Sequence, residues 1–145
     1  MNSRINELLE KYNAVLEISD EIENDGFCIE TPNINVIIVR SGLDTEHIEQ
    51  VILHELGHVA NDNNIIGKYE DYVPRSKMEY HANFYMIEHL LDTWCDVNNI
   101  ELSDINYVAF LEANGLSLNF MPIIKKVLYI KNKQPHSPKT DDVKS

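Results

Sequence analysis

The chain has 145 residues, the size of one ordinary domain, and 43% of them are hydrophobic, with only five Gly and five Pro. This composition is typical of a globular protein with a buried core, and no internal repeat or low-complexity segment interrupts it. The formal net charge of -12 argues against direct nucleic-acid binding, because phosphate contacts need clustered Lys and Arg. It favours solubility and attraction to a basic protein partner.

Membrane insertion and secretion are not expected. No apolar run approaches the roughly 20 residues that span a bilayer, and the first four residues lead into no continuous apolar signal segment. We therefore expect a cytoplasmic protein with no membrane partner. Cys28 and Cys95 fit that compartment, since two Cys residues are too few for a disulfide framework and are expected to be buried thiols.

The chain opens with a pattern typical of an amphipathic helix. Apolar residues recur at helical spacing from Ile5 to Leu16, and Ser3 is the predicted N-cap of a helix over about residues 3–18. We expect this helix to cover the sheet or the helix that carries the active site.

Two short strands are predicted next. A turn at residues 24–26 precedes a strand at residues 27–30, and residues 34–40 are predicted to pair with it as a hairpin. The second strand is predicted to lie at the edge of the sheet. Two interpretations stay open for it: it binds an extended substrate by β-strand addition, or it only supports the helices.

Residues 51–60 form an apolar run that contains a His-Glu-x-x-His motif at His54, Glu55 and His58. On an α-helix, residues four apart lie on one face about 6 Å apart, so His54 and His58 can bind one metal ion. Glu55 lies about 100° around the helix from His54, where its carboxylate can contact a metal-bound water without binding the metal. The motif predicts a zinc hydrolase.

The alternative is a pair of core histidines satisfied by backbone carbonyls. The motif arises by chance in about a few per cent of shuffled chains of this composition, so alone it is a moderate signal. The helical wheel favours the metal site, because both histidines lie on the less apolar face of the helix, opposite a face that is purely apolar. The purely apolar face holds Ile48, Ile52, Leu56 and Val59, and the less apolar face holds His47, Val51, His54, His58 and Asn61.

The predicted motif helix starts at Asp44 or Thr45, either of which can cap it, and ends in the Asn-rich segment 61–64. Gly57 lies inside this helix, where Gly costs about 1 kcal/mol relative to Ala. We therefore expect a neighbouring element to pack closely against Gly57, beside the two histidines.

A catalytic zinc usually takes three protein ligands and leaves a fourth position for water. The extended motif with a third His is absent, because Asn61 and Asn64 occupy its Gly and His positions. Glu79 is the predicted third ligand, since it opens a helical segment predicted to pack against the motif helix. The packing face of that segment holds Ala82, Asn83, Met86 and Leu90. The alternative for Glu79 is a solvated carboxylate near a helix N-terminus.

Other polar residues have weaker predicted roles at this site. Asn83 can hydrogen-bond a ligand His and fix its orientation, as ligating imidazoles usually require. His81 points away from Glu79 and is the weaker ligand candidate, and a position at the rim of the active site stays open for it. Tyr69 and Tyr72, in the loop between the two helices, can stabilise an oxyanion or simply anchor the loop.

The remainder of the chain offers no candidate chemistry. The Glu79 helix is predicted to continue to about Asp96, followed by a helix over residues 103–113 capped by Ser103, and a last helix over residues 122–130. We expect one domain over residues 1–130. The polar, aperiodic residues 131–145 are predicted to be a disordered tail.

The two motifs, His54-Glu55-Leu56-Gly57-His58 and Glu79-x-x-Ala82-Asn83-Phe84, separated by about twenty residues, resemble those of the ImmA/IrrE family of metallopeptidases. The strand before the first motif and residues 107–111 are also similar to short phage members. The resemblance implies an α+β fold: a small, mostly helical zincin-like domain with a short β-sheet next to the motif helix. In it His54, His58 and Glu79 bind Zn²⁺, and Glu55 is the catalytic base. Residues 85–91 depart from the small residues and Leu-Leu-Met-Pro that often follow in the family.

The resemblance also implies a substrate, a helix-turn-helix repressor or regulator encoded nearby in a phage or mobile element. The expected function is therefore zinc-dependent hydrolysis of a peptide bond in such a DNA-binding repressor. One alternative is a non-catalytic antirepressor that binds the regulator and uses zinc as a structural element. Another is a small helical domain whose histidines are incidental. Two imidazoles and a carboxylate also suit manganese or iron.

Overall fold

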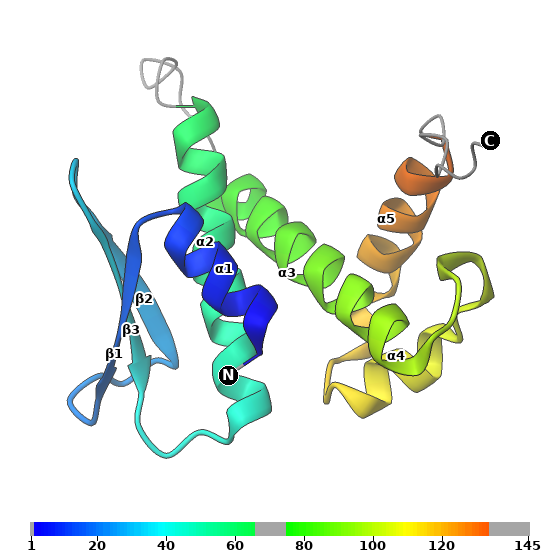
Figure 1. The fold of residues 1–145 in the computed structure, drawn as a ribbon, viewed down its shortest axis with the longest axis horizontal. Coiled ribbons are helices and arrows are strands. Elements are labelled where there is room, and N and C mark those ends of the chain that lie inside the picture. The colour runs from blue at the N-terminus through cyan, green and yellow to red at the C-terminus, as the bar shows by residue number, and fades with distance from the viewer. Residues whose placement is uncertain (1, 66–74, 134–145) are drawn as a thin grey trace. The chain divides into compact units, whose positions relative to one another are not determined.

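The computed structural model describes residues 2–65 and 75–133. Within them, five α-helices and a three-stranded sheet form an α+β fold, as the sequence predicts (Figure 1). The chain divides into two compact units between Leu90 and Leu91. The single domain expected over residues 1–130 stays a prediction. None of the described helices has the length and apolarity needed to cross a membrane.

The first unit contains the sheet and the helices that pack on it. Its strand order is β1-β3-β2, with β1 parallel and β2 antiparallel to β3. The helices α1 and α2 lie on one face of this sheet (Figure 1). Its elements are α1 (Ser3–Lys11), β1 (Ala14–Ser19), β2 (Gly26–Glu30), β3 (Asn35–Arg40), α2 (Thr45–Ile65) and the first part of α3 (Arg75–Asn98).

The predicted first helix over residues 3–18 is wrong in its second half. The helix ends at Lys11, and Asn13 adopts a left-handed φ of 50°, a conformation that Asn tolerates better than most residues. The chain then continues as β1, whose Val15 and Ile18 are β-branched. The cap also differs: Asn2, not Ser3, accepts a hydrogen bond from the backbone N–H of Ile5.

The extra strand changes the place of β3 in the sheet. The hairpin of β2 and β3 is confirmed, but β3 is the central strand and not an edge strand, because β1 pairs with its other side. Strand addition by a substrate at β3 is therefore excluded, since both of its edges are occupied. Among the described strands, the outer edges of the sheet belong to β1 and β2.

The core of this unit lies between the sheet and α2. Ile37 and Val39 of β3 are fully buried, as are Ile52 and Leu56 of α2. The sheet and α2 approach closely at Gly26, where an added Cβ would lie 2.6 Å from Cγ1 of Val51. The sheet therefore holds α2 in place from one side.

A polar cluster joins the end of the sheet to the start of α2. The Asp25 carboxylate accepts a hydrogen bond from the Arg40 guanidinium at 2.7 Å and lies 3.0 Å from Nε2 of His47. Asp44 caps α2, as predicted, by accepting a hydrogen bond from the backbone N–H of His47 at 2.8 Å. The hydrogen bond to Arg40 lowers the pKa of Asp25, and the nearby His47 acts in the same direction.

The second unit is helical in its described residues. It contains the end of α3, the 3₁₀ turns η2 (Leu102–Asp104) and η3 (Leu118–Phe120), α4 (Tyr107–Ala113) and α5 (Met121–Lys133). Its core holds the fully buried Leu91, Phe110, Leu111, Ile124 and Val127.

The boundaries in the second unit differ from those predicted. The predicted helix over residues 103–113 starts later, at Tyr107, because the Asn106 side chain caps it through the backbone N–H of Ala109, and Ser103 lies in η2. The last helix runs to Lys133, so the predicted tail does not begin at residue 131. Residues 134–145 lie outside the described residues. Cys28 and Cys95 are half-buried thiols, and burial raises the pKa of Cys95.

Candidate active site

The two helices that carry the predicted site residues touch at a pair of small residues. A Cβ added to Gly57 of α2 would lie 2.9 Å from both the Cα and the carbonyl oxygen of Ala82 of α3, and 3.0 Å from Cβ of Tyr85. The helix backbones can approach this closely only because Gly57 has no side chain. The close neighbour expected from the sequence is therefore α3.

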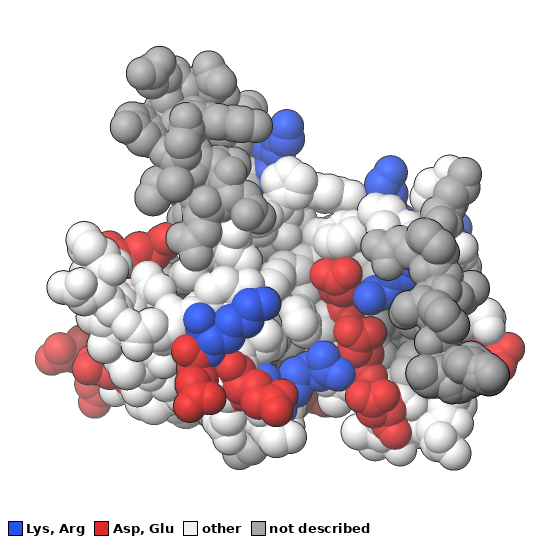
Figure 2. Space-filling model, turned by 45° about the horizontal axis from the view of Figure 1, so that its top comes forward, with Lys and Arg blue, Asp and Glu red and all other residues white. Residues whose placement is uncertain are grey.

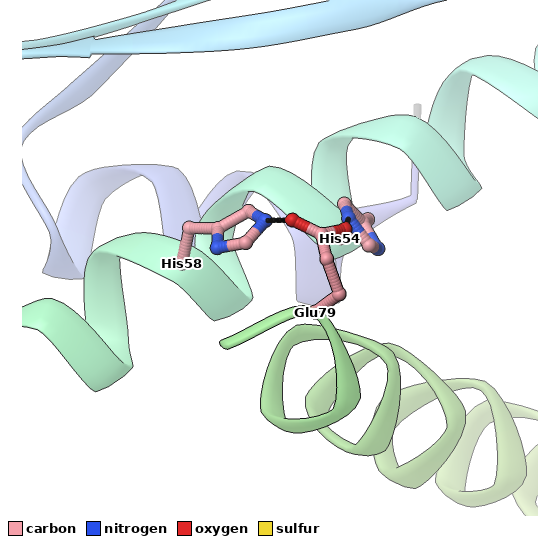
Figure 3. A group of neighbouring side chains, drawn as sticks. All are labelled: His54, His58 and Glu79. Carbon is pink, nitrogen blue, oxygen red and sulfur yellow. Dashed lines mark hydrogen bonds and ion pairs between the residues drawn. The ribbon is translucent and has the colours of Figure 1, made fainter. Parts of the chain in front are cut away.

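This contact brings three side chains together (Figure 3). The Glu79 carboxylate lies between the two imidazoles, with Oε1 3.0 Å from Nε2 of His54 and Oε2 2.9 Å from Nε2 of His58. The imidazole rings are 5.0 Å apart and nearly perpendicular. Both rings are mostly buried, whereas the Glu79 side chain is 40% exposed. The group is thus held by protein on one side and reachable from solvent on the other.

Asn83 lies one turn after Glu79 and contacts the same histidine. Its Oδ1 is 2.9 Å from Nδ1 of His54, whose Nε2 faces the Glu79 carboxylate. Both ring nitrogens of His54 therefore face acceptor oxygens, whereas a neutral imidazole carries only one N–H. With the proton on Nδ1, the Nε2 lone pair points toward Glu79, and a cation bound there would satisfy both groups.

The donor set suits a metal ion. Among the described residues, His54, His58 and Glu79 form one group of possible ligands, with one ligand atom from each within 4.8 Å of the others. Zinc binds imidazole nitrogen and carboxylate oxygen at about 2.0–2.2 Å, so its tetrahedral ligands lie about 3.4 Å apart. The spacing of these three groups therefore fits one ion.

Glu55 lies beside this group but outside it. Burial and, to a smaller extent, the negative charge of Glu79 together raise the pKa of its carboxyl to about 7. A carboxyl group that titrates near neutral pH can both accept and release a proton. This is the chemistry that a catalytic base needs when it also protonates a leaving group.

The remaining predicted residues lie away from the group or outside the described residues. His81 is exposed, and its ring lies against Tyr80. Asn61, at the position of the absent motif Gly, donates a hydrogen bond from its side chain to the carbonyl of Gly57 at 2.6 Å. The predicted roles of Tyr69 and Tyr72 fall outside the described residues.

Comparison with known families agrees with this architecture. Residues 14–94 match the family model of the IrrE N-terminal-like domain, Peptidase M78. The match covers more than half of the chain and includes β1, both histidines, Glu55 and Glu79. The chain belongs to this family. Searches of curated proteins and of solved structures found no match.

Membership of the IrrE N-terminal-like family confirms the resemblance drawn from the two motifs. Together with the His54–His58–Glu79 group, it indicates a protein of metallopeptidase type with a metal centre. The family region ends at Trp94, close to the end of the first unit at Leu90. All the predicted site residues therefore lie within one compact unit. That they bind the metal and catalyse hydrolysis stays a prediction.

Enlarging Gly57 should separate the two helices. In Gly57→Ala, the new methyl group meets backbone atoms of Ala82 that cannot rotate away. We expect a loss of about 1–3 kcal/mol in the free energy of unfolding, measured by urea denaturation, despite the better helix propensity of Ala. Glu46→Ala, at an exposed position of the same helix, is the control and should change stability by less than about 1 kcal/mol. Unchanged stability in Gly57→Ala would refute the close contact.

Removing the Asn83 amide should weaken metal binding. In Asn83→Ala, His54 loses the oxygen that faces Nδ1, and its ring orientation is no longer fixed. We expect zinc affinity to fall about 10–100-fold, measured by competition with a chromophoric chelator. Asn98→Ala, near the end of the same helix, is the control and should retain wild-type affinity. Equal affinities in the two variants would assign Asn83 no positioning role.

Proposed function

We propose that this protein is a zinc-dependent endopeptidase whose substrate is a helix-turn-helix regulator. The observation that carries the proposal is the convergence of His54, His58 and Glu79, with Glu55 beside them, in a member of a peptidase family. The repressor-type substrate rests on the resemblance to the ImmA/IrrE family. The net charge of -12 supports it, because DNA-binding regulators are basic.

The roles of the side chains follow from their positions. His54, His58 and Glu79 hold the zinc ion, and Asn83 keeps the His54 ring in place through Nδ1. When bound, zinc supplies a Lewis acid that lowers the pKa of water toward 7 and polarises a carbonyl group. A carboxylate oxygen of Glu55 accepts the proton of the attacking water and then donates it to the nitrogen of the leaving amine.

The choice of zinc rests on ligand chemistry. Two imidazoles and one carboxylate form the ligand set of several zinc hydrolases, although the same donors also bind manganese and iron. Metal analysis of protein purified without added metal or chelator tests this choice. We expect about one zinc per chain, and a stoichiometric content of another metal would replace zinc in the proposal.

Incubation with a candidate regulator tests whether the protein cleaves it. The zinc-loaded protein is incubated with the helix-turn-helix regulator encoded beside its gene, and the products are identified by mass spectrometry. We expect two fragments from one cleaved bond, and none after chelation of the metal. An intact regulator that nevertheless leaves its operator DNA would contradict the peptidase and favour an antirepressor that acts by binding.

A further inference from the structure

The sheet of the first unit has one face packed against α2 and one face turned away from it. Ile37 and Val39 of β3 point into the core, so the alternate residues Val36 and Ile38 point to the opposite side. The strand register adds Val15 and Ile29 beside Val36, and Glu17 and Phe27 beside Ile38. We define the outer face of the sheet by its apolar side chains Val15, Phe27, Ile29, Val36 and Ile38; Glu17 lies on the same side, at the β1 edge.

This outer face is apolar and exposed. Val15 is 42% and Ile29 46% exposed, and Phe27, Val36 and Ile38 are half-buried. Among the described elements of this unit, α1 and α2 lie on the other side of the sheet (Figure 1). Five adjacent apolar side chains form a continuous patch, which differs from the scattered exposed residues of ordinary surfaces and is typical of interaction sites.

The surroundings of the outer face are strongly acidic. Residues 12–39, which include β1, β2 and almost all of β3, contain six acidic residues and no Lys or Arg. Arg40, the next basic residue, is paired with Asp25. The six acidic residues are Glu17, Asp20, Glu21, Glu23, Asp25 and Glu30. In Figure 2, several acidic side chains at the left of the view, the side on which Figure 1 draws the sheet, have no Lys or Arg beside them.

We propose that the outer face of the sheet is a docking surface for a basic protein partner. A patch with an apolar centre and an acidic rim is complementary to a surface with apolar residues among Lys and Arg. A second copy of this chain is disfavoured, because two acidic rims would face each other. The proposal rests on the proposed function, in that the partner is the folded regulator that the active site cleaves.

The position of the outer face indicates that its partner is a folded domain and not a short peptide. The packed sheet lies between this face and α2, the helix that carries His54 and His58. A peptide of a few residues bound at the metal ligands does not contact the outer face, because the packed sheet lies between them and the peptide would have to pass around the edge of the sheet. A folded domain of the regulator can contact both. The outer face therefore selects whole regulators and leaves cleavage of short peptides unaffected.

Binding to the outer face can be tested without any cleavage. Methyl NMR spectra of the Glu55→Gln chain are recorded during titration with a 14-residue amphipathic Leu–Lys peptide, and with a Leu–Glu peptide of equal length. We expect the Leu–Lys peptide, but not the Leu–Glu peptide, to shift the methyl signals of Val15, Ile29, Val36 and Ile38. Added salt should make these shifts smaller. Shifts confined to other regions, or equal shifts with both peptides, would overturn the docking surface.

Matched variants test whether the residues of the outer face bind the Leu–Lys peptide. Val15→Thr combined with Ile29→Thr keeps β-branched side chains on the strands but removes apolar surface, and should lower peptide affinity at least 10-fold. Ile18→Thr is the control: Ile18 is 53% exposed on the same strand, but its register partner is the core residue Val39, so it lies on the other face. Equal affinities in the double variant and the control would overturn the proposal.

Kinetics distinguish a failure of docking from a failure of the proposed function. For the wild-type protein and the double variant, kcat/KM is measured with the whole regulator and with a short peptide that contains its scissile bond. Docking predicts a kcat/KM at least 10-fold lower for the double variant with the regulator, through KM, and no change with the peptide. If the double variant and the wild-type protein have equal kcat/KM values with each substrate, the docking surface is overturned and the proposed function is not. If the wild-type protein cleaves neither substrate, the proposed function fails, and the NMR titration still decides on docking.

Discussion

Glu55→Gln is expected to slow peptide-bond hydrolysis by at least about 100-fold while leaving the bound metal in place. The amide keeps the size of the carboxyl group but cannot accept a proton from water, so general-base catalysis is lost. Removal of a general base typically costs about 10²–10⁴-fold in rate, and we expect kcat to fall within this range. Since Glu55 is not among the three grouped ligand candidates, zinc content should stay at the wild-type level.

The measurement combines metal analysis with the rate of regulator cleavage. Glu46→Gln, an exposed substitution near the start of the same helix, is the control and should retain full activity. A Glu55→Gln protein that loses its metal would show that Glu55 is needed for binding. One that cleaves at the wild-type rate would show that another group accepts the proton.

The site could be predicted from the sequence because its determinants are local and periodic. The distance between His54 and His58 on one helix follows from the helical repeat alone. The pairing with Glu79 needed one further step: Ala82 and Asn83 follow Glu79 at helical spacing, and Gly57 is small, so both helices present a close-packing face. The structure brings these faces together, with Gly57 against Ala82.

The prediction failed where two patterns overlap. Tyr12 and Leu16 are four residues apart, which suits a helix, but Val15, Glu17 and other residues of the same segment also alternate along a strand. Tertiary pairing decides between them, because β1 gains its backbone hydrogen bonds from β3, about twenty residues later in the chain. The sequence of this segment does not indicate that it pairs with β3. The error then placed β3 at an edge, although it lies at the centre.

The cap residues of two helices were predicted wrongly for a similar reason. Asn2 and Asn106 cap their helices where Ser3 and Ser103 were predicted. Both residue types are good N-caps, so propensity alone cannot choose between neighbours. The choice depends on where the preceding chain must lie. Asn2, for example, also donates its backbone N–H to the Glu49 carboxylate of α2, a contact that the sequence does not reveal.

Zinc binding should raise the thermal stability of the protein, and Glu79→Gln should remove this effect. A ligand that binds only the folded state stabilises it by RT ln(1 + [L]/Kd), or about 4 kcal/mol at a free zinc concentration 1,000 times Kd. For a chain of this size, that corresponds to a rise of roughly 10–15 °C in Tm. Glu79→Gln keeps the side-chain shape but replaces the charged oxygen donor between the two imidazoles, so its Tm should rise far less with zinc.

Differential scanning calorimetry with buffered zinc measures both effects without any substrate. Glu112→Gln, an exposed substitution in α4, is the control and should keep the full zinc-dependent rise. If Tm of the wild-type protein did not depend on zinc, the three side chains would not form a metal site. An equal rise in Glu79→Gln would place the ion on other residues. Because Glu79 joins α3 to the two histidines of α2, we expect the stabilisation to depend on all three, and His58→Ala should lose it as completely as Glu79→Gln.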